Sequence, residues 1–387
     1  MNPKGWFKRA VIYQVFVDRF NGFSSVNNVP GFAGGTLKGV TQKLEYLKDL
    51  GISVIWLSPF YGTTSYHGYH ITDFENVDPR FGNQEDLQHL VLKAKSMGIR
   101  VIADFVPNHC SVHHPFFSHA ISHPGSPYRP WFIFEDWPDT YKCFLDFTEL
   151  PKLNLEHHET RGYIIDVAHQ WLSMGMDGFR LDHVIGPSHG FWSAFSKEIG
   201  EKHPEAILIG EAWAGGLEIK HYHTVGFRKK TWRKLFGVSQ EQIQLEYRKT
   251  MDGTLDFFLR ELIKNAVVAG QPLLSDRRLH NQIREHLRKL PTGYHMVAFL
   301  DNHDTDRFIR YCGGQVDLLL QAFELLFSLD LPVVIFTGTE NCRPNELEVT
   351  PMQANSDLQV RAPMDWARLN DQFMSGFRAL VRKYRQP

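Results

Sequence analysis

The sequence predicts a closed barrel of eight parallel strands, each followed by a helix. Short β-rich runs alternate with helical patterns along the chain, and such alternation indicates parallel βα units. The length of 387 residues suits one barrel of this kind enlarged by insertions. Polar and charged residues also follow the strand candidates at the same end, which is where α/β barrels carry their functional groups.

The strand candidates cover residues 11–17, 53–57, 100–105, 178–181, 206–209, 254–258, 295–300 and 332–336. Helical patterns lie between them at residues 40–50, 84–97, 160–174, 190–203, 227–236, 257–269, 277–290, 315–329 and 369–384. The helix at 227–236 carries the chain's only basic cluster, which we interpret as a solvated helix face. The chain is therefore expected to form a single catalytic domain over residues 1–387.

Residues 110–156 interrupt the alternation after the third strand candidate. They are rich in histidine, proline and aromatic residues and show no clear period, so we predict an inserted subdomain. Its aromatic residues are either the small core of this insertion or a platform on which sugars stack. Its histidines lack the spacing of metal ligands and are interpreted as loop residues.

The composition excludes several classes of protein. The chain is 43% hydrophobic and 22% charged with a formal net charge of -1, so neither nucleic acid nor an anionic membrane is an expected partner. No run is apolar enough for a membrane span. The four cysteines are scattered, which is typical of free thiols in a reducing compartment and predicts a cytoplasmic location. The oligomeric state is left open.

Chemically useful side chains follow almost every strand candidate at its carboxyl end. They are Asp104, His109, Arg180, Asp182, Glu211, His303 and Asp304, with Tyr69 in the loop after the second strand. Packing alone does not need this arrangement, so a rim of structural salt bridges is the weaker interpretation. We therefore predict that these residues form one functional site.

The pattern of carboxylates suits the cleavage of glycosidic bonds. That reaction uses one carboxyl group as acid and a second as nucleophile, about 5 Å apart when configuration is retained. Burial after an apolar strand should keep Glu211 protonated, whereas Arg180, two residues before Asp182 on the same strand face, should keep Asp182 ionised.

Four motifs give the chain a close resemblance to the α-amylase family of retaining glycoside hydrolases. They are Asp104-Phe-Val-Pro-Asn-His109, Gly178-Phe-Arg-Leu-Asp182, Gly210-Glu-Ala-Trp213 and Phe299-Leu-Asp-Asn-His-Asp304, in the family's order. The resemblance implies a (β/α)₈ barrel with Asp182 as nucleophile, Glu211 as acid and base, and Asp304 as the third carboxylate. It further implies that Arg180 orients Asp182, that Asp104 braces Arg180, and that Tyr69, His109 and His303 bind the sugar.

The sequence departs from the family pattern in ways that bear on cofactors and specificity. Lys152 in Leu150-Pro-Lys-Leu-Asn154 stands where calcium-dependent members carry an aspartate ligand, and a lysine repels calcium. We therefore expect no metal or other cofactor, although Asn108 remains a candidate calcium ligand. The same lysine resembles the neopullulanase and cyclomaltodextrinase side of the family. The β-sandwich that usually follows the barrel in this family is expected to be absent.

The resemblance implies an α-glucan oligosaccharide as substrate and hydrolysis of α-1,4 bonds in starch-derived maltooligosaccharides. A cyclomaltodextrinase-like or neopullulanase-like hydrolase or transglycosylase is the nearest alternative. The alternative from another class is a silent carbohydrate-binding protein on the same fold. The three intact carboxylates argue against a protein without catalytic activity.

Overall fold

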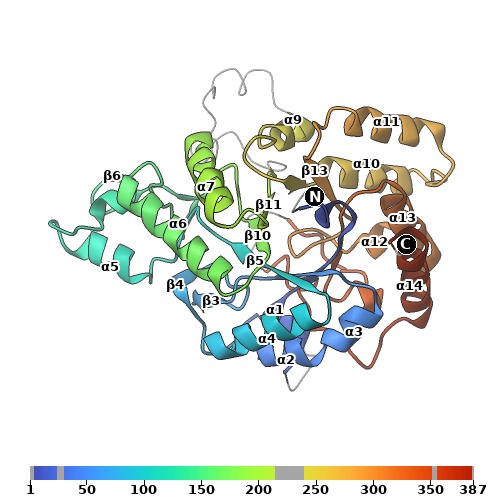
Figure 1. Ribbon diagram of the computed structural model, residues 1–387, viewed down its shortest axis with the longest axis horizontal. Helices are drawn as coiled ribbons and strands as arrows, with labels where there is room; N and C mark the ends of the chain where they lie inside the picture. The colour runs from blue at the N-terminus through green and yellow to red at the C-terminus, as the bar shows by residue number, and fades with distance from the viewer. Residues whose placement is uncertain (1–3, 24–29, 214–238, 351–354, 386–387) are drawn as a thin grey trace.

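A closed barrel of eight parallel strands forms the centre of the protein (Figure 1). The computed structural model describes residues 4–23, 30–213, 239–350 and 355–385. In barrel order the strands are β1 (Val11–Val15), β14 (Val333–Phe336), β13 (His295–Phe299), β12 (Gly253–Leu255), β11 (Ile207–Gly210), β10 (Gly178–Leu181), β5 (Arg100–Phe105) and β2 (Val54–Leu57). The predicted fold class is confirmed.

The sixth barrel strand, β12, differs most from its predicted range. It ends at Leu255, and residues 256–258, predicted as strand, instead begin helix α10 (Phe257–Val268). The cause is local, because Asp256 Oδ1 accepts a hydrogen bond from the Leu259 backbone N–H at 3.0 Å and so caps the helix.

Side chains alternate between two cores along each barrel strand. On β2, Val54 and Trp56 join a cluster inside the barrel, whereas Ile55 and Leu57 join the larger cluster between barrel and helices. This alternation follows from the two-residue repeat of a strand. It also decides which polar residues near the strand ends face the barrel axis.

Helices cover the outside of the barrel (Figure 1). They are α1 (Val17–Phe20), α2 (Leu37–Gln42), α3 (Leu44–Asp49), α4 (Gln84–Ser96), α6 (His158–Ser173), α7 (His189–Lys202), α9 (Gln240–Leu245), α10, α11 (Arg277–Leu287), α12 (Phe308–Tyr311), α13 (Val316–Ser328) and α14 (Asp371–Arg385). The helix predicted at 40–50 is divided into α2 and α3 at Lys43. The helix predicted at 227–236 lies outside the described residues. Among the described helices, none has both the length and the apolar run needed to cross a bilayer.

The last helix shows how an apolar stripe fixes a helix on the barrel. Phe373, Met374, Phe377 and Val381 are the buried residues of α14, at the three- and four-residue spacing of one helix face. Phe377 meets Phe323 of α13 edge to face at 5.3 Å between ring centroids. These two helices therefore pack as a pair (Figure 1).

The segment predicted as an insertion projects from one end of the molecule (Figure 1). It contains α5 (Pro115–Ser122), the 3₁₀ turn η2 (Arg129–Trp131) and two short hairpins, β6 (Phe134–Asp136) with β7 (Thr140–Tyr141) and β8 (Cys143–Phe144) with β9 (Phe147–Pro151). A further hairpin, β3 (Tyr61–Thr63) with β4 (Ile71–Val77), follows β2. Trp131 and Phe132 are buried. These two aromatic residues therefore belong to the core of the insertion.

Candidate active site

Strand alternation brings the predicted charged residues to the barrel axis. On β10, Phe179 and Leu181 face the outer core, so Arg180 faces inward and Asp182 follows on the same side. On β5, Ala103 and Phe105 likewise face outward and leave Asp104 inside. All three charged side chains are at least 90% buried.

Arg180 is the centre of this cluster. Its Nη1 lies 2.7 Å from Asp104 Oδ1 and 2.9 Å from Asp182 Oδ1, and its Nη2 lies 2.5 Å from Glu211 Oε1. One guanidinium thus holds three carboxyl groups from three neighbouring strands. Carboxyl groups on the two amino groups of one guanidinium lie only a few ångström apart, which matches the short spacing that retaining glycosidases need.

Glu211 has the environment predicted for an acid. It follows β11, where Ile207 and Ile209 line the barrel interior, and its Oε2 accepts the His183 backbone N–H at 3.1 Å. Burial raises the pKa of Glu211 above its usual value, although Arg180 opposes that rise. The carboxyl group is therefore biased towards the protonated form.

The expected ionisation of Asp182 stays a prediction, because burial and Arg180 shift the pKa of this carboxyl group in opposite directions. Burial raises the pKa of Asp182 to about 7 in spite of Arg180, and the charges of Glu211 and Asp304 raise it further. Arg180 cannot distinguish the two groups as the sequence suggested, because it contacts both Asp182 and Glu211. The two carboxyl groups therefore titrate as a pair.

Asp304 is held by a different set of contacts. Arg361 Nη2 lies 2.7 Å from Asp304 Oδ1, and His303 Nε2 lies 3.0 Å from Asp304 Oδ2. Burial alone would raise the pKa of Asp304, but the contacts with His303 and Arg361 keep it well below its usual value. Asp304 is therefore the carboxylate that stays ionised.

Tyr69 connects Asp104 with His303. Its hydroxyl donates to Asp104 Oδ2 at 2.8 Å and lies 2.7 Å from His303 Nε2. The Tyr69 and His303 rings are nearly parallel, with centroids 5.3 Å apart. The predicted sugar-binding residues Tyr69 and His303 therefore meet directly.

His109 lies against the insertion. Its ring stacks on Phe144 of β8 with centroids 4.7 Å apart, and Phe144 meets His183 edge to face at 4.6 Å. Burial lowers the pKa of His109 to about 3, so the ring is neutral. His109 Nε2 is buried without a hydrogen-bond partner among the described residues, which leaves it free to bind a ligand.

Sequence reasoning missed two residues of the site, Arg361 and Gln14. Arg361 lies in irregular chain after β14, and no motif marks it. Gln14 interrupts an otherwise apolar strand, and this single polar residue is the one signal that could have found it. Asp18, at another strand end, does not join the site. Its carboxylate instead accepts the backbone N–H of Ala33 at 2.8 Å.

Lys152 is the residue that the family resemblance led us to expect at a calcium-ligand position. Its side chain is buried, and Nζ donates to the Gly186 carbonyl at 2.7 Å. Asn108 Oδ1, the remaining candidate ligand, is buried without a hydrogen-bond partner in the described chain. A Cβ at Gly186 would lie 2.1 Å from that oxygen, so only glycine permits this approach. The donor set thus combines one free amide oxygen with a cation, which does not suit calcium.

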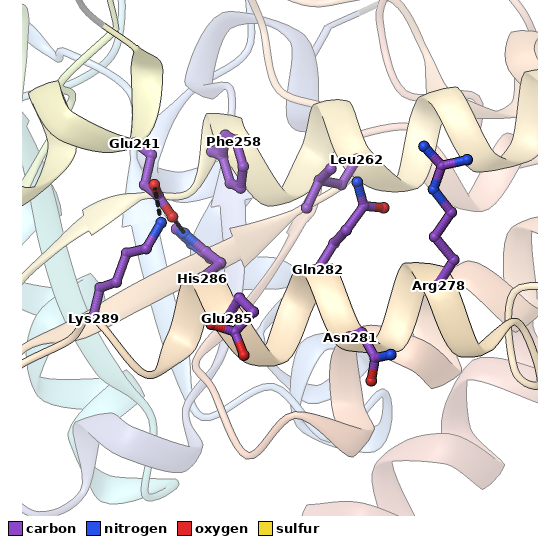
Figure 2. Close-up of a pocket in the computed structure, with 9 residues that line it drawn as sticks. All are labelled: Glu241, Phe258, Leu262, Arg278, Asn281, Gln282, Glu285, His286 and Lys289. Atoms are coloured by element: carbon purple, nitrogen blue, oxygen red, sulfur yellow. Dashed lines mark hydrogen bonds and ion pairs between the residues drawn. The ribbon is translucent and has the colours of Figure 1, made fainter.

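A separate groove of about 540 Å³, lined by none of the site residues described above, lies on α9, α10 and α11 (Figure 2). At one end of it, His286 Nδ1 lies 2.8 Å from Glu241 Oε1 and Lys289 Nζ lies 2.5 Å from Glu241 Oε2. His286 Nε2 also lies 2.9 Å from Asp256 Oδ2. These ion pairs connect α11 to α9 and to the N-terminal cap of α10.

Comparisons with known proteins find similarity over nearly the whole chain. The family model "Alpha amylase, catalytic domain" matches residues 14–384. Alpha-amylase 2 of Dictyoglomus thermophilum is 32% identical over 97% of this chain and 63% of its own length. A cyclomaltodextrinase of Geobacillus thermopakistaniensis is 32% identical over 93% of this chain and 59% of its own length.

A solved structure is also similar. The cyclic alpha-maltosyl-(1→6)-maltose hydrolase of Arthrobacter globiformis superposes with a TM-score of 0.80 at 27% identity, covering 97% of this chain and 82% of that one. The chain thus spans about three fifths of the length of the two curated relatives and most of the solved structure. This protein belongs to the α-amylase family, and the family's catalytic domain covers nearly all of the chain.

Proposed function

We propose that this chain is a retaining hydrolase of α-glucans with a preference for cyclic or short maltooligosaccharides. The observation that carries the proposal is the pair Asp182 and Glu211 on one guanidinium, beside the separately held Asp304. The sequence alone favoured an α-amylase acting on starch-derived maltooligosaccharides. The cyclomaltodextrinase relative and the cyclic-maltosyl-maltose hydrolase favour the alternative prediction instead.

The reaction proceeds in two displacements. Glu211 gives its proton to the glycosidic oxygen while the Asp182 carboxylate attacks the anomeric carbon, so the C–O bond to the leaving sugar breaks as the glycosyl ester forms. Glu211, now ionised, takes a proton from water, and that water displaces Asp182. The two inversions restore the α configuration.

The remaining residues favour the charged transition state. An oxocarbenium-like centre gains from Asp304, which stays ionised, and from hydroxyl contacts that tighten as the ring flattens. His109 and His303 supply ring nitrogens to these hydroxyls, and Tyr69 supplies an aromatic face. Arg180 keeps Asp182 and Glu211 aligned for the two steps.

The protein needs no calcium under this proposal. The Lys152 ammonium donates to the Gly186 carbonyl in place of a metal ion, and its charge repels any other cation. A cytoplasmic location remains a prediction from the cysteine pattern.

Proton NMR of the anomeric signals tests the function. Purified protein is incubated in parallel with β-cyclodextrin and maltoheptaose, and spectra are followed from the first minutes. We expect α-anomer signals before mutarotation and faster cleavage of the ring. Initial β-anomer signals would exclude retention. Faster cleavage of maltoheptaose would favour the α-amylase type, and no change in either sugar would favour a silent binding protein.

A further inference from the structure

Gln14 is a buried polar residue on the inner face of β1. Its neighbour Ile12 belongs to the barrel interior, and strand alternation places Gln14 on the same side, one pleat nearer to the active site. The side chain is fully buried, and its Nε2 lies 2.7 Å from His303 Nδ1. Gln14 thus contacts the ring nitrogen of His303 that does not meet Asp304 and Tyr69.

The groups around His303 determine which of its ring nitrogens carries a proton. His303 Nε2 faces two oxygens, Asp304 Oδ2 at 3.0 Å and the Tyr69 hydroxyl at 2.7 Å. Asp304 is a carboxylate and only accepts, so a proton must lie on Nε2. The Tyr69 hydroxyl donates onward to Asp104 Oδ2, so it accepts from His303 rather than donating to it.

The other ring nitrogen of His303, Nδ1, needs a hydrogen-bond donor. In a neutral imidazole with its proton on Nε2, Nδ1 carries a lone pair and needs a donor. The Gln14 amide N–H is that donor. This orientation leaves Gln14 Oε1 buried without a hydrogen-bond partner in the part of the chain that the structure describes. The unpaired Oε1 is the cost of presenting the amide donor to Nδ1.

We propose that Gln14 is a positioning residue that holds the His303 imidazole neutral, with its single proton on Nε2 and directed at Asp304 and the sugar hydroxyls. The role towards sugar depends on the proposed function above, whereas the protonation state of the ring does not. A reversed amide would accept from Nδ1–H, and with Nε2–H still directed at Asp304 the ring would then have to be doubly protonated. The neutral ring also adds no second cation beside Arg180, whose contacts then control the Asp182–Glu211 pair.

The other titratable and charged groups near His303 come from several elements. They are Tyr69 and His67 from the loop after β2, Asp104 from β5, Arg180 from β10, Asp304 from its own loop, and Arg361, which donates from Nε to the His303 carbonyl at 2.8 Å. Phe16, Trp56 and Phe336 supply apolar ring contacts. Among the described residues, Gln14 is the group in direct contact with His303 Nδ1.

NMR of the imidazole nitrogens tests the proposal without substrate. Protein labelled with ¹⁵N only in histidine is measured by long-range proton–nitrogen correlation at neutral pH, and His303→Asn identifies the signals of this ring. We expect a protonated Nε2 and an unprotonated Nδ1. A proton on Nδ1, whether alone or together with one on Nε2, would overturn the proposal.

Variants at Gln14 separate positioning from a merely structural role. Gln14→Met keeps the volume but removes the donor, so the ring should lose its single tautomer and kcat should fall about 10²-fold with a smaller change in KM. Gln14→Glu presents an acceptor and should draw a proton onto Nδ1. Gln244→Met removes another fully buried amide, on α9, and should leave the His303 spectrum unchanged.

Two results would contradict the positioning role directly. One is a Gln14→Met spectrum identical to that of the wild type, and the other is a Gln14→Glu ring that still lacks a proton on Nδ1. The expected tautomer in a protein that cleaves no α-glucan would overturn the proposed function while supporting the role of Gln14. The two failures are therefore distinguishable.

Discussion

Arg361 and Asp304 form an ion pair of 2.7 Å although they lie 57 residues apart in the sequence. Arg361 also donates to the His303 carbonyl and pairs with Asp357 at 2.6 Å. The segment after β14 therefore returns over the barrel mouth and fixes the third carboxylate of the site. Arg180 contacts Asp182 and Glu211 in the corresponding way.

The first prediction concerns Arg361. Arg361→Met should lower kcat/KM about 10²-fold, because Asp304 loses both its fixed position and a neighbouring cation. Arg361→Lys should recover part of the loss, since it keeps the charge but not the planar fork that also reaches the His303 carbonyl. Steady-state kinetics on β-cyclodextrin measure both. Equal rates in the wild type and the methionine variant would contradict the role.

The two proposed catalytic carboxyl groups should be indispensable. Asp182→Asn and Glu211→Gln should each reduce kcat by about 10³-fold or more, because one removes the nucleophile and the other the acid. Release of reducing sugar is the measurement, with circular dichroism to verify folding. Glu205→Gln, an exposed change, is the matched control and should have wild-type activity.

The rate should depend on pH through the Asp182–Glu211 pair. Asp182 must be ionised to attack, and its pKa is raised to about 7 by burial, so kcat/KM should fall as pH decreases below about 7. At higher pH the rate should fall again as Glu211 loses its proton. The negative charge of Asp304 contributes to the raised pKa of Asp182. In Asp304→Asn the acid limb of the residual activity should therefore move to lower pH, and a move to higher pH would refute this assignment.

Stability should depend on pH at His286 (Figure 2). Burial opposes its charge, but Asp256 and Glu241 raise the pKa of His286 above its usual value. A raised folded-state pKa gives stability that is fully present below the unfolded pKa of about 6.5 and is lost as pH rises through the folded pKa. His286→Gln should therefore cost about 2–4 kcal/mol at pH 5.5 and clearly less at pH 9.

Urea unfolding at the two pH values measures this difference. His280→Gln on the same helix is the matched control, because His280 Nε2 contacts only the Leu273 carbonyl among its recorded partners and faces no carboxylate there. We expect the control to show no such dependence on pH. An equal cost of His286→Gln at both values would mean that the ring is not charged in the folded protein.

Metal removal should not affect the fold. The melting temperature should be the same with and without EDTA, because the Lys152 ammonium lies where a calcium ligand would otherwise be. Lys152→Met should cost about 1–3 kcal/mol, since the buried Gly186 carbonyl loses its donor. A drop of several degrees in EDTA that calcium reverses would show this reasoning to be wrong.

The sequence by itself determined the barrel and the residues of its rim. Eight apolar runs separated by helical patterns leave few topologies, and the two-residue repeat of a strand places Asp104, Arg180 and Glu211 on the inner face. These are local relations, so the printed order of residues is enough to derive them. The end of β12 was misjudged because the Asp256 cap is also local but was not recognised.

Only the tertiary structure decided the electrostatics of the site. Arg180 was expected to ionise Asp182 alone, but barrel closure brings Glu211 onto the same guanidinium and buries both carboxyl groups. Arg361 contacts His303 from irregular chain that lies 58 residues away in the sequence. Gln14 contacts His303 from the first strand, 289 residues away. Burial and contacts between distant segments depend on how the barrel closes, which no local pattern of residues records.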